Sequence, residues 1–256
     1  MGQDLTACLH QYYELQGIAV NNFRCPHSGK CESAAAPELL TGRGSEAHVG
    51  SQYGNPVRIV IVSLDRGEGA EDVWKRSASI EGLPAHGKGL NPHMSGTLAT
   101  LKAILGERGG PTLWSRFAMI NAAKCCYGNM DAVPDSLYRA CSEFGLQELI
   151  RLKPQIVVTQ GRNAKEPVRL RQYSISQRAR DIAERYLSGC TKPELRDAVE
   201  WMIERYIHQI DLGESKCLWL ETPHPSDRAG RWHPFRCVFL PVLGGVMQEL
   251  LASGLS

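Results

Sequence analysis

Four polar or charged residues follow short apolar runs in this 256-residue chain, at positions where they could act together. Asp65 comes shortly after the first run, Asn121 directly after the second, Gln160 after the third and His224 after the fourth. In an open parallel sheet the carboxyl ends of the strands meet at one edge, where ligands bind. Each residue alone is more often a cap or turn residue, but all four at strand ends predict a site. A carboxylate, amides and an imidazole gathered there are suited to general acid–base and electrostatic catalysis.

Nine cysteines form a second set of chemically active side chains. The N-terminus shows no secretory signal, so we expect reduced thiols or metal ligands rather than disulfides. Cys25 and Cys31 flank a turn-like segment, and Cys125, Cys126 and Cys141 follow much later in the chain. Free cysteines that pack as small hydrophobic residues are the alternative.

The net charge of +2 hides a local basic segment. Residues 151–180 hold eight basic side chains and one acidic side chain, Glu166, so the rest of the chain is acidic. A basic stripe on a nearly neutral protein is typical of a face that binds a polyanion. A solvated helix face is an equally good interpretation of the charge alone.

The elements that must position these residues read as an α/β pattern. Each apolar run is short, as expected for a strand that is buried on both faces of a parallel sheet. The runs are Val57–Val62, Phe117–Ile120, Gln155–Thr159 and Cys217–Leu220. Helices are expected at Ser95–Leu105, Asp135–Leu152 and Ser176–Ile210, and Cys31–Pro56 is expected to be a loop because it is rich in Gly, Ser, Ala and Pro.

The composition is that of a globular protein, with 43% hydrophobic and 22% charged residues. These values argue against a disordered or fibrous chain. No apolar run approaches the roughly 20 residues that a bilayer span needs. We therefore expect a soluble, cytoplasmic protein without a membrane partner.

Motifs around the second, third and fourth runs form a set. Asn121-Ala122-Ala123-Lys124-Cys125 is followed sixteen positions later by Cys141; Leu152-Lys153-Pro154 precedes the third run, Gly161 and Ala164 follow it, and His224-Pro225-Ser226 closes the set. Together these motifs resemble the uracil-DNA glycosylase superfamily, most closely its branch with an iron–sulfur cluster, over roughly Cys25–Leu251. The resemblance implies a three-layer α/β/α fold with a central four-stranded parallel sheet in one domain, 1–256. A cluster-binding segment would span 1–56 and a helical insertion about 171–213.

The resemblance also implies a cofactor. A [4Fe–4S] cluster would be held by Cys25, Cys31, Cys125 and Cys141, although four thiolates suit zinc as well. The first two cysteines are separated by five residues, whereas the family usually places two residues between them. This departure bears most on Cys25, and Cys126 is an alternative to Cys125.

For the active site, the resemblance assigns roles residue by residue. Asn121 matches the residue that hydrogen-bonds the flipped base, and His224 matches the residue that stabilises charge on the departing base. Asp65 falls where the classical branch has its water-orienting carboxylate, with Glu68 as the alternative. His93 stands where the family usually has a stacking Phe, so it could both stack and hydrogen-bond. The other residues expected to bind the base are Ser63, Gln160 and Ser226.

We therefore expect a monofunctional, monomeric DNA glycosylase that removes uracil or another modified pyrimidine from single- or double-stranded DNA. One alternative is a glycosylase for a bulky phage base, such as glucosylated hydroxymethylcytosine, that acts in antiphage defence. A second is a non-catalytic iron–sulfur protein that binds DNA or senses damage. Trp232 could fill the gap left by the flipped base, although packing in the core explains a Trp near a Pro equally well. Residues expected to contact DNA are Arg162, Arg169, Arg171, Arg228, Arg231 and Trp232.

Overall fold

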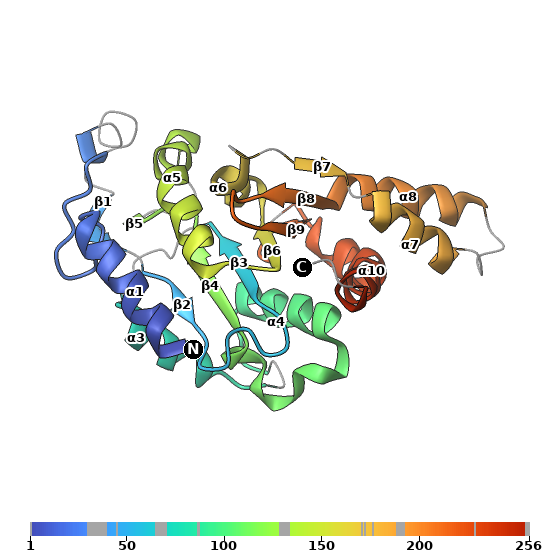
Figure 1. The fold of residues 1–256 in the computed structure, drawn as a ribbon, viewed down its shortest axis with the longest axis horizontal. Helices are drawn as coiled ribbons and strands as arrows, with labels where there is room; N and C mark the ends of the chain where they lie inside the picture. Colours follow the sequence, from blue (N-terminus) through green and yellow to red (C-terminus); the bar gives the residue numbers. More distant parts are fainter. Residues whose placement is uncertain are drawn as a thin grey trace.

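The computed structural model of this protein describes most of the chain (Figure 1). The described residues are 2–29, 40–44, 46–64, 71–85, 88–127, 134–169, 171, 173–175, 177–187, 193–227 and 229–253. Four residues to which the sequence assigns a role lie outside this range. They are Cys31, Asp65, Glu68 and Arg228.

A seven-stranded mixed sheet forms the centre of the fold. Its order is β2 (His48–Val49), β4 (Phe117–Asn121), β3 (Ile59–Ser63), β6 (Ile156–Gln160), β9 (Lys216–Thr222), β8 (Ile207–Asp211) and β7 (Tyr173–Ile175). The four expected strands are β3, β4, β6 and β9, and they run parallel to one another. The expectation of a central four-stranded parallel sheet therefore holds only in part, because β2, β8 and β7 extend these strands with antiparallel pairs into a mixed sheet.

The parallel strands are buried on both faces, as their apolar sequences predict. One face packs against residues of α1 (Gly2–Leu15), α5 (Asp135–Leu152) and α6 (Glu166–Arg169), with the start of α3 (Val73–Glu81). The other face packs against α4 (Pro92–Leu105), α7 (Gln177–Leu187), α8 (Pro193–Tyr206) and α10 (Leu240–Ala252). Helices therefore cover both faces of the sheet (Figure 1). Short helical segments complete the described elements: η2 (Gly106–Ser115), η4 (Arg162–Lys165), α9 (Trp232–Pro234) and η5 (Phe235–Phe239).

Two segments differ from the sequence prediction. The segment Cys31–Pro56, expected to be a loop, contains β2 and also β1 (Leu40–Gly44), which pairs with β5 (Cys125–Tyr127). The expected helix Ser176–Ile210 ends at Tyr206, and the next residues form β8. Ile210 has the apolar spacing of the residues in α8, which is why the sequence predicted a longer helix. In the structure its backbone belongs to β8 and pairs with β9. The described residues of the segment expected to be a helical insertion, about 171–213, thus form two strands as well as two helices.

The C-terminal helical run is long and apolar. Trp232–Ala252 spans 21 residues with a mean hydropathy of 1.4, which by length and composition alone is enough to cross a membrane. Pro234, Pro241 and several polar residues interrupt the run, and one such helix is weak evidence for a membrane span because the core helix of a soluble protein passes the same test. In the structure, Leu243 and Val246 of α10 are buried in the core that α4 shares.

A buried ion pair joins three segments on the α5 side of the sheet. Lys124 follows β4, and its Nζ donates to Oε2 of Glu148 in α5, with both side chains at most 1% exposed. Tyr13 of α1 donates to the other carboxylate oxygen, 2.6 Å away. The Tyr13 hydroxyl in turn accepts a hydrogen bond from the Ala47 amide at 3.2 Å. Burying these charges is favourable only while each keeps its partner.

We expect Glu148→Ala to lower the free energy of unfolding by about 3–5 kcal/mol, because it leaves the Lys124 ammonium buried without a counter-ion. The control is Glu143→Ala, which removes an exposed carboxylate from the same helix. Urea unfolding of both variants at neutral pH measures the difference. Equal midpoints would show that the pair does not hold these segments together.

A candidate active site at the carboxyl ends of the parallel strands

The last residues of the parallel strands meet at one edge of the sheet. Ser63, Asn121 and Gln160 end β3, β4 and β6, and Thr222 ends β9. Ser63 lies opposite Asn121 in the register, and Gln160 lies opposite Thr222. His224 follows two residues after the last strand. Because the strands are parallel, three of the four residues that led the sequence analysis come together as expected; the fourth, Asp65, is outside the described residues.

His93 connects two of these strand ends. It lies in the first turn of α4, which begins with Pro92 and is capped by the Asn91 side chain through the Met94 amide at 2.8 Å. The His93 Nε2 atom is 3.0 Å from Ser63 Oγ and 2.9 Å from Gln160 Oε1. The helix start thereby fixes the imidazole between β3 and β6.

A threonine that the sequence analysis missed holds the Gln160 amide. Thr97 lies one turn after His93 in α4, and its hydroxyl accepts a hydrogen bond from Gln160 Nε2 at 3.1 Å. With the amide nitrogen bound there, Gln160 Oε1 faces His93. The His93 Nε2 then carries a hydrogen and donates to Gln160, which leaves Nδ1 as an acceptor. The Gln160 side chain is thus used to orient His93.

His224 lies directly beside His93. The two rings are stacked, with centroids 5.4 Å apart and an interplanar angle of 4°. The Ser226 amide donates to His224 Nδ1 at 3.2 Å, so that atom is unprotonated and Nε2 carries the hydrogen. The Ser226 backbone amide therefore orients His224, and the expected contact of Ser226 with the base stays a prediction.

Two glycines make room for the segment that carries His224. A Cβ on Gly161, whose φ is +100°, would lie 3.1 Å from the His224 Cβ. A Cβ on Gly96 in α4 would lie 2.3 Å from the Pro225 Cβ. Close packing of Pro225 on the helix fixes the position of His224, which explains why glycine stands at both sites.

Both imidazoles are neutral at physiological pH. Burial, together with the neighbouring His224, lowers the pKa of His93 to about 4. Burial also lowers the pKa of His224, although the Asp227 carboxylate acts in the opposite direction. Neutral rings with defined tautomers can donate hydrogen bonds without bringing a positive charge into the site.

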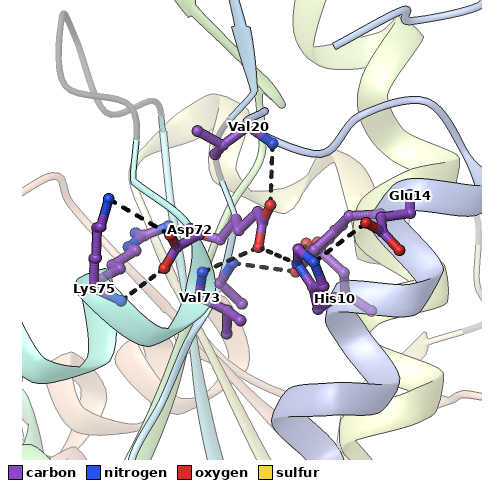
Figure 2. A network of polar contacts seen from close by, with 11 residues as sticks. His10, Glu14, Val20, Asp72, Val73 and Lys75 are labelled. Atoms are coloured by element: carbon purple, nitrogen blue, oxygen red, sulfur yellow. Dashed lines mark hydrogen bonds and ion pairs between the residues drawn. The ribbon is translucent and has the colours of Figure 1, made fainter. Parts of the chain in front are cut away.

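Asn121 is buried, and a residue that sequence analysis missed contacts it. Arg76 Nη2 donates to Asn121 Oδ1 at 2.6 Å, and Arg76 Nη1 donates to the Glu46 carbonyl oxygen. The Glu46 carboxylate accepts hydrogen bonds from the Val20 and Val73 amides at 3.0 Å and contacts His10 at 3.1 Å. Figure 2 shows His10, Val20 and Val73 with the hydrogen bonds of this network as dashed lines. Arg76 follows Lys75 in the sequence, and two adjacent basic residues are typical of a solvated surface. The sequence therefore contains no indication that Arg76 is buried at the site.

An open pocket of about 890 Å³ lies beside His224. Helix α8 contributes Arg205 and Tyr206 to its wall, and the loop after His224 contributes Asp227 and Arg231. Arg231 Nε is 2.7 Å from Asp227 Oδ2, an exposed ion pair that phosphate can compete with. The pocket wall therefore combines basic and acidic side chains with apolar surface.

The residues expected to contact DNA differ in how far their side chains are exposed. Trp232 is 8% exposed and stacks with Phe235 in the core, which corresponds to the packing alternative and not to a side chain that fills a gap in DNA. Arg162 and Arg169 are exposed, and each contacts a nearby carboxylate. Arg171 is half-buried, and its Nε has no hydrogen-bond partner within the described part of the chain. The basic stripe is thus accessible at the two exposed arginines, and its role stays a prediction.

Three of the expected cluster ligands are buried cysteines in one region. A hydrogen bond with Cys125 lowers the pKa of the Cys141 thiol, whose Sγ also accepts from the Lys124 amide at 3.4 Å. Burial, and to a smaller extent Cys141, raises the pKa of Cys25. Within the described residues no group of three side chains is arranged to hold a metal ion. Cys31 lies outside the described residues. The one observation among them that fits a cluster is that the thiols of Cys25, Cys125 and Cys141 lie near one another.

Comparison with known proteins adds no relative. The chain matches no protein-family model and no curated protein. The candidate site therefore stands on its own geometry.

The depressed pKa of His93 predicts a loss of stability in acid. The unfolded chain binds a proton near pH 6.5 but the folded protein only near 4, so stability is complete above 6.5 and falls as the pH drops toward 4. His48 is fully buried in β2, and burial lowers its pKa to about 3. This residue contributes at most about 1.4 kcal/mol per pH unit to the loss of stability. His93 adds less, since its ring is partly exposed.

We expect His48→Gln and His93→Gln each to flatten the dependence of unfolding free energy on pH between 6.5 and 4. The control is His233→Gln, at an exposed histidine, which should keep the wild-type slope. Urea titrations at half-unit pH steps measure the slopes. Wild-type stability that stays constant over this range would contradict the prediction.

Proposed function

We propose that this protein is a DNA glycosylase of the uracil-DNA glycosylase type, which hydrolyses the N-glycosidic bond of a flipped-out uracil or other modified pyrimidine. The observation that carries the proposal is that Asn121, His93 and His224 come together at one edge of the sheet. Asn121 ends β4, His93 lies between the carboxyl ends of β3 and β6, and His224 follows β9 and stacks on His93. These are the positions that the sequence motifs assign to base recognition and leaving-group stabilisation. Enzymes that act on a base take it out of the stack first, at a cost of a few kcal/mol.

The geometry suits departure of an anionic base. As the glycosidic bond breaks, its electron pair goes to the base, and water adds to the sugar carbon. His224 Nε2–H is a neutral donor that stabilises the negative charge on a base oxygen. We assign the water-orienting carboxylate to Asp65, with Glu68 as the alternative. That carboxylate also offsets the positive charge on the sugar and takes up the proton that the water releases.

A second candidate is removal of a bulky hypermodified pyrimidine, such as glucosylated hydroxymethylcytosine, in antiphage defence. The observation that favours it is the pocket of about 890 Å³ beside His224, walled by Arg205 and Tyr206 of α8. The charged and polar side chains in this mixed wall suit a substituent with hydroxyl groups. His93 adds a polar atom where the family has an apolar ring.

DNA, single- or double-stranded, is the proposed partner, with Arg231, Arg162 and Arg169 as phosphate contacts. A [4Fe–4S] cluster on Cys25, Cys31, Cys125 and Cys141 is the proposed cofactor, with zinc as the alternative. The cluster is assigned a structural role, and no chemical step passes through it. We further propose that the protein acts as a monomer in the cytoplasm.

We expect the wild-type protein to leave abasic sites on oligonucleotides that carry uracil or a modified pyrimidine, detected by alkaline cleavage. His224→Leu should lower the single-turnover rate about 10²–10³-fold, because it removes the Nε2–H donor to the departing base. Asp227→Asn, in the same loop, is the control and should change the rate far less. Abasic sites on no substrate, with DNA binding retained, would instead support the non-catalytic alternative.

The cofactor proposal predicts a brown protein whose colour is lost in Cys141→Ser. Iron and sulfide analysis of the purified protein measures the cluster directly. Cys217→Ser changes a buried cysteine far along the chain, in β9, and should keep the iron. Zinc without iron in the wild type would overturn the cluster in favour of the alternative.

A further inference from the structure

Arg76 is a buried cation beside the candidate site. It lies in the first turn of α3, on the same inward face as Val73 and Ile80, and is 4% exposed. Its neighbour Lys75 has a side chain that is 78% exposed. A guanidinium keeps its charge in the interior, so its burial is tolerated only where hydrogen bonds satisfy its donors.

The contact between Arg76 and Asn121 fixes the orientation of the amide. Arg76 Nη2 is 2.6 Å from the Asn121 side chain. A guanidinium has donors and no acceptor, so the Asn121 atom that faces it is the oxygen. The amide nitrogen is therefore turned away from Arg76. Rotation of the amide by 180° would place NH2 against the guanidinium, donor against donor.

The protein also holds Arg76 itself in place. Its second nitrogen, Nη1, donates to the backbone carbonyl of Glu46. The Glu46 carboxylate is fully buried and accepts hydrogen bonds from the Val73 and Val20 amides, each at 3.0 Å. Val73, labelled in Figure 2, is the first residue of the helix that carries Arg76, so Glu46 is hydrogen-bonded both to the start of this helix and to Arg76 itself.

The orientation of this amide has a chemical consequence for base recognition. A 4-oxo pyrimidine presents an acceptor at position 4, whereas a 4-amino pyrimidine presents a donor there. An asparagine can read either pattern, but it must rotate its amide to change from one to the other. An amide that cannot rotate reads one pattern and leaves a buried polar group unpaired against the other, which is a strong basis for discrimination.

We propose that Arg76 is a specificity-determining positioning residue, which locks the Asn121 amide so that the site discriminates between 4-oxo and 4-amino pyrimidines. The inference rests on the proposed glycosylase function, because it takes Asn121 as the residue that reads the base. Arg76 acts through Asn121 and is not itself a catalytic residue.

The test compares Arg76→Gln with Arg76→Lys. Lysine keeps a donor and no acceptor, so it holds the Asn121 oxygen, whereas glutamine offers both and lets the amide rotate. Affinity is measured for oligonucleotides with an uncleavable 2′-fluoro nucleotide that carries a 4-oxo base or its 4-amino counterpart. We expect the wild-type affinity ratio to fall at least 10-fold in Arg76→Gln and to be largely kept in Arg76→Lys. An unchanged ratio in Arg76→Gln overturns the inference.

A control and a double-mutant cycle separate positioning from stability. Lys124→Gln removes another buried cation close to Asn121 in the sequence, and it should lower stability without changing the ratio. In an Asn121→Ala background, Arg76→Gln should have no further effect on the ratio, because the residue through which it acts is gone. An equal effect in both backgrounds would refute the role.

Amide NMR of the free protein tests the lock independently of any substrate. The Asn121 NH2 signals, assigned by their loss in Asn121→Ala, should be one sharp pair in the wild type and Arg76→Lys. In Arg76→Gln they should broaden or double through exchange between two orientations. If the wild type forms no abasic site on any substrate, the proposed function is wrong, but these signals still test whether Arg76 fixes the Asn121 amide. If the signals are identical in all three proteins, Arg76 does not fix the amide and the inference is wrong.

Discussion

The burial of the Arg76 guanidinium is the constraint around which this end of the molecule is organised. A permanent charge taken out of water needs its donors satisfied, and here a strand-end amide and a backbone carbonyl supply acceptors. The carbonyl belongs to Glu46, whose own carboxylate is held by the amides of Val20 and Val73. The N-terminal segment, the start of α3 and the end of β4 therefore form one connected polar structure beneath the candidate site.

A second buried charge holds the other end of the same loop. Asn121 ends β4, and only three residues later Lys124 pairs with Glu148. The loop between them is short and is fixed at both ends by charged hydrogen bonds, which are about twice as strong as neutral ones. It also leads into Cys125, whose neighbour in space is Cys141. Asn121 and Cys125 thus lie on one short segment that is anchored by separate charged hydrogen bonds at Asn121 and at Lys124.

Patterns of apolar spacing were enough to predict the central strands and the helix Asp135–Leu152, because burial on both faces and an amphipathic stripe leave a direct trace in sequence. They failed at Ile207–Ile210, where an apolar residue fell on the helical stripe by coincidence, and at β2, which is too short to show a period. Within the site, strand-end position revealed Asn121, Gln160 and His224. It could not reveal Arg76, since burial of a charge depends on partners distant in sequence.

The segment between β6 and β9, which contains α8 and β8, has one more effect, on the sheet itself. Without it, β9 would be an edge strand seven residues long, with unpaired backbone groups open to another chain. Instead β8 covers that edge, and the sheet ends at the three-residue β7; at the opposite edge it ends at the two-residue β2. Short outer strands give a second molecule little to pair with. The segment that brings Arg205 and Tyr206 to the pocket therefore also protects the fold from aggregation, and it could not be deleted to open the pocket without exposing a long strand.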